Sequence, residues 1–240
     1  MSAGAGDSGR HDPARRPLPG DRARDIARAF LPDWPLGNRY HYYYARAKLR
    51  SDPLYPGVCE ALRGTRAPVL DLGCGIGLLA HALQQDGIGV RYFGVDNDAR
   101  KIVSARRAAA RAGLVDAGFE TLDLSQALPP HRGSVAILDV MQFFDPPRQV
   151  ALVDALAGML EPGARLVIRT GLDDGSRRAR VTRAGDRLAR ALRWMNASPR
   201  HYPEAEMLRA RFEAGGLRSE FIPLYGDTPF NNWRIVAWRE

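Results

Sequence analysis

The chain has few of the residues that hold small or metal-dependent domains together. It contains only two cysteines, Cys59 and Cys74, which lie in unrelated sequence contexts. Two such residues support neither a disulfide framework nor the paired spacing of a zinc site. The five histidines are scattered along the sequence, so we expect no metal centre.

Long hydrophobic runs are also missing. No stretch approaches the roughly 20 apolar residues that cross a bilayer, and the Gly-, Ser- and Arg-rich N-terminus lacks the apolar core of a secretory signal. The apolar share of 45% is that of a globular protein, and 240 residues suffice for one domain of ordinary size. These features favour a cytoplasmic protein.

Lysine is nearly absent as well, since it occurs only at Lys48 and Lys101, and the formal net charge of +8 comes from arginine. A stripe from Arg177 to Arg193 holds seven arginines against the single Asp186. Such a stripe can attract an acidic partner, such as nucleic acid, an anionic membrane or an acidic carrier protein. Charge runs more often only solvate a face, and both interpretations stay open.

The order of short apolar runs and periodic segments predicts an α/β fold. Strands alternating with helices indicate a parallel sheet covered on both faces. The predicted strands are 69–72, 92–95, 119–122, 135–138 and 166–168, and the helices between them are 78–85, 98–112 and 149–160. Two last runs, 219–224 and 234–238, are expected to pair antiparallel at the edge. We therefore predict a Rossmann-like, seven-stranded, mostly parallel sheet with an antiparallel last strand.

Composition divides the chain into three parts. Residues 1–22 lack periodicity and are expected to be a disordered basic tail. An aromatic, helix-forming segment over 23–66 is expected to form an N-terminal cap. The sheet domain would then span 67–240, with a helical insertion at about 171–217 that includes helices near 179–195 and 204–214.

Three glycines follow the first predicted strand in Asp71-Leu72-Gly73-Cys74-Gly75-Ile76-Gly77. Gly73 and Gly75 let the main chain approach a ligand that a Cβ atom would exclude, and Gly77 allows a helix to pack closely on the strand. Free N–H groups where the helix begins favour an anionic group such as a carboxylate. The spacing differs from the G-x-G-x-x-G of dinucleotide enzymes, which disfavours a nicotinamide oxidoreductase.

Carboxylates follow the next three strands at the same rim of the sheet. Asp96 ends the second strand, where an acid is placed to accept hydrogen bonds from ribose hydroxyls. Asp123 follows the third strand and suits an exocyclic amine such as that of adenine. Asp139 ends the fourth strand, beneath the place where a reacting group would lie.

This ordered combination resembles the class I S-adenosylmethionine-dependent methyltransferases. Residues Val69 to Ala80 look like their first motif, and the three later acids fall at the following motif positions. The resemblance implies methyl transfer with S-adenosylmethionine as cofactor, with Asp71 holding its amino group through water. The cofactor contacts expected are Asp71, Gly73, Cys74, Gly75, Gly77, Asp96, Asn97, Asp123, Leu124, Asp139 and Met141. A non-catalytic module that only binds the cofactor is the alternative of another class.

The rim after the fourth strand bears on the methyl acceptor. Methyltransferases that act on amino groups usually carry Asn/Asp-Pro-Pro-Tyr/Phe there, whereas this chain reads Asp139-Val140-Met141-Gln142. The later Asp145-Pro146-Pro147-Arg148 lacks the aromatic residue and is interpreted as a helix start. Nucleic-acid methylation is therefore disfavoured, although an RNA methyltransferase stays as the alternative.

The acceptor pocket is expected in the segments outside the core, because loops at strand ends carry function in such sheets. His41, Tyr44 and Lys48 recur at i, i+3 and i+7, so they share one helix face that offers a base, an aromatic wall and a cation. His41 and Tyr44 are the catalytic candidates. A cap that packs on the core, with Lys48 reaching water, is the competing interpretation. The substrate-binding candidates are Tyr43, Lys48, Gln142, Arg169, Trp194, Asn231 and Asn232.

A narrower resemblance rests on two stretches, 38–48 and 228–233. Both are similar to methyltransferases associated with bacterial aryl-polyene pigments and related fatty-acid or polyketide pathways. This resemblance implies a phenolic aromatic acceptor, free or carried as a thioester on an acidic carrier protein. It leaves open whether carbon or oxygen is methylated.

Overall fold

The computed structural model describes residues 16–173 and 201–240. The predicted helix near 179–195, the arginine stripe from Arg177 to Arg193, and Trp194 lie outside the described residues. Within the described ranges, no helix is long and apolar enough to cross a membrane.

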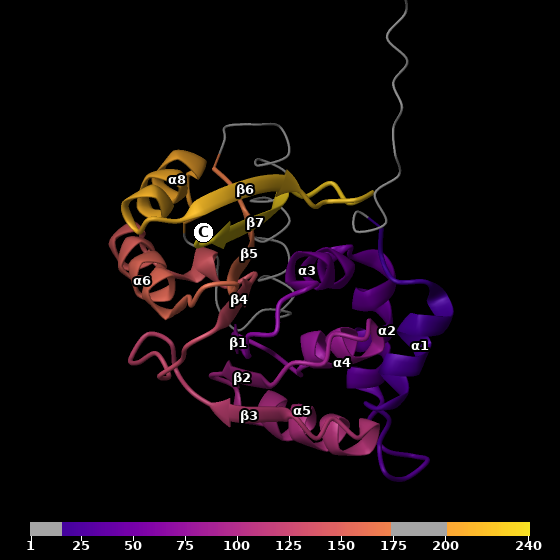
Figure 1. Ribbon diagram of the computed structural model, residues 1–240. Coiled ribbons are helices and arrows are strands. Elements are labelled where there is room, and N and C mark those ends of the chain that lie inside the picture. Colours follow the sequence, from indigo (N-terminus) through magenta and orange to yellow (C-terminus); the bar gives the residue numbers. More distant parts are fainter. Residues whose placement is uncertain (1–15, 174–200) are drawn as a thin grey trace, which may run out of the picture.

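Seven strands form one sheet in the order β3-β2-β1-β4-β5-β7-β6 (Figure 1). The first five are parallel to one another, whereas β7 lies antiparallel between β5 and β6. The strands are β1 (Val69–Leu72), β2 (Tyr92–Asp96), β3 (Ala117–Thr121), β4 (Ser134–Leu138), β5 (Arg165–Gly171), β6 (Arg218–Pro223) and β7 (Asn232–Trp238). The predicted fold and the antiparallel last strand are thereby confirmed.

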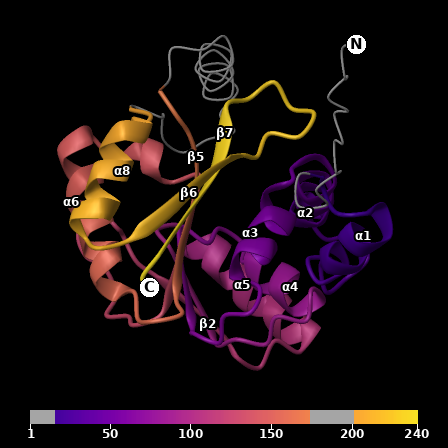
Figure 2. The same ribbon diagram turned by 45° about the horizontal axis from the view of Figure 1, so that its top comes forward.

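Helices cover both faces of the sheet, as Figure 2 shows. One face carries α3 (Leu54–Leu62), α4 (Leu78–Gln85) and α5 (Ala99–Ala112), with α1 (Gly20–Arg28) and α2 (Tyr40–Ser51) packed outside them. The other face carries α6 (Pro146–Met159) and α8 (Ala205–Ala214). A short 3-10 helix, η2 (Met141–Phe143), follows β4.

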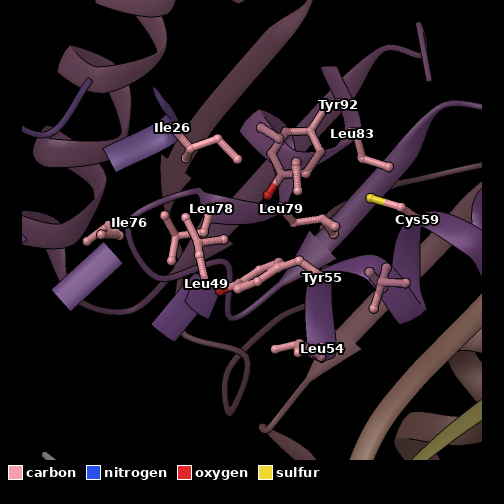
Figure 3. Packing of buried hydrophobic residues seen from close by; sticks show 14 of the residues in the cluster. Ile26, Leu49, Leu54, Tyr55, Cys59, Ile76, Leu78, Leu79, Leu83 and Tyr92 are labelled. Atoms are coloured by element: carbon pink, nitrogen blue, oxygen red, sulfur yellow. The ribbon is translucent and has the colours of Figure 1, made fainter. Parts of the chain in front are cut away.

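Strand alternation divides the core in two. In β1, Val69 belongs to the cluster under α3 and α4, whereas Leu70 and Leu72 belong to the cluster under α6 and α8. Figure 3 shows part of the first cluster, in which Leu49 of α2 and Tyr55 of α3 lie beside Leu78 and Leu79 of α4. The N-terminal helices are thus built into the same core as the glycine loop.

Two of the helices begin at a capping aspartate. Asp98 caps α5 by accepting from the Arg100 N–H, and Asp145 caps α6 by accepting from the Arg148 N–H. Two prolines occupy the first turn of α6, where their missing N–H groups have no helical partner to lose. The interpretation of Asp145 as a helix start is confirmed.

Three expectations need correction. Helix α1 begins at Gly20, so residues 20–22 are helical rather than part of a disordered tail. Strand β5 does not end at Ile168 as predicted, because β7 pairs with it as far as Gly171 and extends it. Strand β3 begins and ends earlier than predicted, at Ala117–Thr121, because its register is fixed by pairing with β2.

The strand order reverses between β1 and β4, which have β2 and β5 on their outer sides. In open α/β sheets, ligands bind at the carboxyl ends of the strands where the order reverses. The loop 73–77, which connects β1 to α4, and the residues after β4 both lie at this point.

Candidate functional site

The glycine loop after β1 is held in place by backbone hydrogen bonds to β2. The N–H groups of Gly73 and Cys74 both donate to the Val95 carbonyl, at 2.8 and 2.9 Å. All three glycines have positive φ, which L residues rarely adopt. A Cβ atom on Gly75 would meet nothing within 4 Å, whereas one on Gly73 would lie 2.4 Å from the Val140 side chain. Gly75 therefore faces open space, and Gly73 also serves the packing of the loop against the residues after β4.

Asp96 at the end of β2 supports this loop directly. Its carboxylate is buried, and one oxygen accepts from the Gly75 N–H at 2.9 Å while the other accepts from the Asp98 N–H at 2.9 Å. The Lys101 ammonium lies 3.9 Å from the second oxygen. Each carboxylate oxygen accepts more than one hydrogen bond, so Asp96 can still receive ribose hydroxyls.

Asp71, within β1, is buried under α4. One of its oxygens accepts from the Tyr92 hydroxyl at 2.5 Å, and the other has no hydrogen-bond partner among the described residues. Burial raises the pKa of the Asp71 carboxyl to about 7, even though the Tyr92 hydrogen bond lowers it. A buried carboxylate oxygen without a donor is the feature that an ammonium group, or water bound to one, would satisfy.

Four charged side chains meet beside the loop, and we call Lys48, Asp52, Asp139 and Arg169 the charge cluster. The Lys48 ammonium lies 2.6 Å from Asp52 and 3.6 Å from Asp139. The Arg169 guanidinium donates to Asp52 at 3.1 Å and also to Asp139. The two cations and two anions balance, and each cation contacts both carboxylates.

Asp139 joins the charge cluster to the glycine loop. It is the only non-glycine residue with positive φ in the described ranges, at 60°. Such a conformation costs on the order of 1–3 kcal/mol and persists where the surroundings enforce it. Its N–H donates to the Arg169 carbonyl at 2.8 Å, and the following Val140 is the residue that touches Gly73. The charge cluster thus lies one residue away from the loop.

The three side chains of α2 that were predicted to share one helix face, His41, Tyr44 and Lys48, have different neighbours. Lys48 belongs to the charge cluster, and burial, with a contribution from Asp139, raises the pKa of the Tyr44 hydroxyl. His41 instead shares a hydrogen bond of 2.8 Å with the Ser104 hydroxyl of α5. Burial and the nearby Arg107 lower the pKa of His41, so its imidazole is neutral at pH 7. Tyr44 and Lys48 therefore lie near Asp139, while His41 faces α5.

The remaining candidates divide into buried and exposed groups. Met141 and Gln142 of η2 are buried, and the Gln142 side-chain oxygen has no partner among the described residues. Asp123 is exposed and accepts from the Ser125 N–H at 2.8 Å, close to the end of β3. Leu124 is buried, whereas Asn97 and Tyr43 are exposed.

The two asparagines predicted to bind substrate, Asn231 and Asn232, make contacts within and beside the sheet. The Asn231 side-chain amide donates to the Leu172 carbonyl at 3.0 Å, and its oxygen accepts from the Trp233 indole at 3.1 Å. Asn232 is the first residue of β7 and pairs with Gly171 of β5. Both are buried, and the described contacts give each of them a structural role.

Sequence reasoning missed several residues that complete the site. Asp52 was not singled out, although Asp52-Pro53-Leu54 has the pattern of a helix start and its carboxylate accepts from the Leu54 N–H at 3.0 Å. Tyr92 was read only as a strand residue, and Ser104 and Lys101 only as parts of a helix. The contacts of Tyr92 with Asp71 and of Ser104 with His41 join segments that are 21 and 63 residues apart, whereas Lys101 approaches Asp96 from the helix that follows β2.

The same region matches known proteins. Residues 69–163 match the family model described as a methyltransferase domain. This match covers less than half of the chain, and together with the fold and the site geometry it supports a methyltransferase that uses S-adenosylmethionine as its cofactor.

Among curated proteins, a ubiquinone biosynthesis O-methyltransferase of Xylella fastidiosa (strain 9a5c) is 35% identical over 106 residues, which are 43% of this chain and 42% of that protein. A protein of the same description from Neisseria meningitidis serogroup C (strain 053442) is 31% identical over 112 residues, 45% of each chain. The chain thus spans less than half the length of the curated relatives it matches. Among solved structures, magnesium protoporphyrin IX methyltransferase from Synechocystis PCC 6803 with bound S-adenosylhomocysteine aligns with a TM-score of 0.60 at 19% identity, over 92% of this chain and 96% of that one.

The residues present fit this cofactor. The carboxylate oxygen of Asp71 that lacks a partner suits its ammonium group, and the open space at Gly75 leaves room beside the backbone N–H groups. Asp96 is already oriented by two backbone donors and has lone pairs left for ribose hydroxyls. When bound, the cofactor supplies an electrophilic methyl group on a positively charged sulfur.

Protonation of Asp71 should make cofactor binding depend on pH. We expect S-adenosylhomocysteine to bind more weakly as the pH falls through about 7, because the carboxyl of Asp71 takes up a proton there and loses its attraction for an ammonium group. In the Asp71→Asn variant, binding should be weaker at pH 8 and should lose most of this pH dependence. Calorimetric titrations between pH 5.5 and 8.5 measure both, and an equally steep profile in the variant contradicts the assignment.

Proposed function

We propose that this chain transfers a methyl group from S-adenosylmethionine to an oxygen of a small aromatic acceptor, a phenol that is free or carrier-bound. One observation carries the proposal. The residues after β4, at the edge of the sheet beside the glycine loop, belong to the charge cluster and do not form an amino-methylation motif. Asp139 belongs to both parts, since it follows β4 and contacts Lys48 and Arg169.

Similarity to known proteins supports oxygen as the acceptor atom. The curated relatives in Xylella and Neisseria are described as O-methyltransferases, and their aligned segments amount to less than half of each protein. One solved structure of the same fold, at 20% identity and a TM-score of 0.59, is described as mitomycin 7-O-methyltransferase. These descriptions concern the relatives, and they favour a small-molecule acceptor for this chain.

The described residues suggest separate roles in the reaction. Tyr44 keeps its proton at neutral pH and can donate a hydrogen bond to the acceptor, since the pKa of its hydroxyl is raised. The neutral imidazole of His41 retains the chemistry of a base, and the hydrogen bond with Ser104 fixes its ring. The aromatic rings of Tyr40 and Tyr44 stack with their centroids 6.2 Å apart, which extends an apolar wall along α2. Alignment of the acceptor oxygen with the methyl carbon, at about 3–3.5 Å, is the geometry that these residues must provide.

A methyl-transfer assay tests the proposal. The protein is incubated with labelled S-adenosylmethionine and 4-hydroxybenzoyl-type acceptors, free or attached to a carrier protein, beside tRNA and rRNA. We expect label in an aromatic methyl ether. Labelled RNA without a labelled aromatic would refute the proposal, and cofactor binding without transfer to any acceptor would favour a binding module.

Replacing Asp96 by alanine should weaken cofactor binding. The change removes a buried acceptor for ribose hydroxyls and leaves the Gly75 N–H without its partner, so the loss should be roughly 1–3 kcal/mol, or about 5- to 150-fold in Kd. Calorimetry with S-adenosylhomocysteine measures the effect. Asp154→Ala, which breaks a surface pair with Arg211 on the other face, is the control and should leave Kd unchanged.

A further inference from the structure

The ammonium group of Lys48 has a free hydrogen-bonding direction beside the glycine loop. It carries three N–H donors. One is directed to Asp52 at 2.6 Å, and Asp139 lies at 3.6 Å as a second, longer partner. No hydrogen bond from Lys48 to a third acceptor occurs among the described residues. The side chain is 24% exposed, so the cluster does not bury Lys48 completely.

The position of Lys48 is fixed relative to the cofactor site. Asp139, which contacts Lys48, is followed by Val140, and the side chain of Val140 packs against Gly73 of the loop. Asp52, the closer partner, is buried and also held by Arg169 of β5. The ammonium group therefore cannot move far from the rim at which β1 and β4 end.

We propose, on the basis of the proposed function, that Lys48 binds the acceptor oxygen in its ionised form and so selects acceptors with an acidic hydroxyl, such as phenols or enols. In this role Lys48 touches the reacting oxygen and is a catalytic residue that stabilises an anion. Acceptors with aliphatic hydroxyls, which do not ionise near neutral pH, are poor substrates.

The groups around Lys48 favour anion binding over proton abstraction by the lysine. Asp139 and Asp52 raise the pKa of Lys48 against the effects of burial and Arg169, so the amine stays protonated at neutral pH. Tyr44 is the other titratable group that faces it. Asp139 is paired with both cations of the charge cluster, and His41 lies seven residues away, about 10 Å along the helix axis. The protonated Lys48 amine cannot accept the proton of the acceptor hydroxyl, but it can stabilise the negative charge on the oxygen that has lost this proton.

The reaction then balances simply. The acceptor O–H loses its proton to solvent, and the resulting oxygen anion is held by the Lys48 ammonium. A lone pair of this oxygen forms the O–CH₃ bond while the bond between methyl carbon and sulfur breaks, and its electron pair stays on sulfur. The products are a neutral aryl ether and the neutral thioether S-adenosylhomocysteine.

The ionisation of a bound coloured phenol tests the proposal without relying on activity. The protein, saturated with S-adenosylhomocysteine, is mixed with 4-nitrocatechol, and the absorbance of the phenolate is followed against pH. We expect the pKa of the bound probe to lie about 1 unit or more below that of the free probe. The shift should disappear in Lys48→Met and persist in part in Lys48→Arg, which keeps the charge.

Two measurements separate this inference from the function on which it rests. Thermal unfolding of each variant shows that the fold is retained, and Arg211→Met serves as the control for loss of a cation elsewhere. An equal shift in Lys48→Met and the wild-type protein, or no shift in the wild-type protein, overturns the role of Lys48. If phenols still receive the labelled methyl group in that case, the proposed function stands. A phenolate shift without methyl transfer to any acceptor defeats the proposed function instead.

Discussion

Replacing Arg169 by methionine is expected to lower the free energy of unfolding by about 3–5 kcal/mol. Arg169 is 5% exposed, and its guanidinium donates to both Asp52 and Asp139. Without it, two carboxylates share only the Lys48 ammonium, and Asp52 stays buried with part of its charge uncompensated. Urea unfolding followed by circular dichroism measures the change.

A surface ion pair provides the matched comparison for Arg169. Arg211→Met breaks a pair with Asp154 that is 2.6 Å long, and about two fifths of each side chain is exposed. Exposed pairs contribute about 0–1 kcal/mol, so this variant should be close to wild type. Adding Asp52→Asn to Arg169→Met should restore part of the lost stability, because it removes the charge left behind. Equal effects of the two single arginine variants would show that burial does not strengthen the cluster.

Replacing Gly77 by alanine should damage both stability and cofactor binding. Its φ is 81°, a left-handed conformation that costs an L residue about 1–2 kcal/mol. The new methyl group would also lie 2.6 Å from the Phe119 ring, and such overpacking costs typically about 1–3 kcal/mol. Because Gly77 leads into α4, the shift should displace the loop, and S-adenosylhomocysteine should bind much more weakly in calorimetry.

Gly113 supplies the control for this substitution. Its φ is 67°, and a Cβ atom there would meet nothing within 4 Å. Gly113→Ala therefore carries only the conformational cost, at the C-terminal end of α5 and away from the site. We expect a smaller loss of thermal stability than in Gly77→Ala and an unchanged Kd for S-adenosylhomocysteine. An equal loss in the two variants would assign the whole effect to backbone conformation.

Local patterns predicted the sheet and most of the cofactor rim. The run Val69–Leu72, the helix Leu78–Gln85 and the cap at Asp145 depend on burial and hydrogen bonds between near neighbours, which a sequence displays directly. The ends of some strands could not be predicted from local sequence. Strand β5 extends to Gly171 because it pairs with β7, which follows more than 60 residues later.

The charge cluster was only half visible in the sequence. Lys48, Asp139 and Arg169 were singled out separately, but Asp52, which pairs with both Lys48 and Arg169, is 117 residues from Arg169. Periodicity placed His41 on the same face as Lys48, yet it cannot tell that α5 covers one end of that face and the charge cluster the other. Pairing across such separations is decided by how the helices pack.

The balance of the charge cluster has a consequence for product release. Two cations and two carboxylates already neutralise one another, so an ionised acceptor is the only uncompensated charge that this group has to hold. Methylation removes that charge and leaves an ether that the Lys48 ammonium no longer attracts electrostatically. Because the charge cluster is neutral by itself, it should bind the neutral methylated product more weakly than the ionised acceptor, which favours product release.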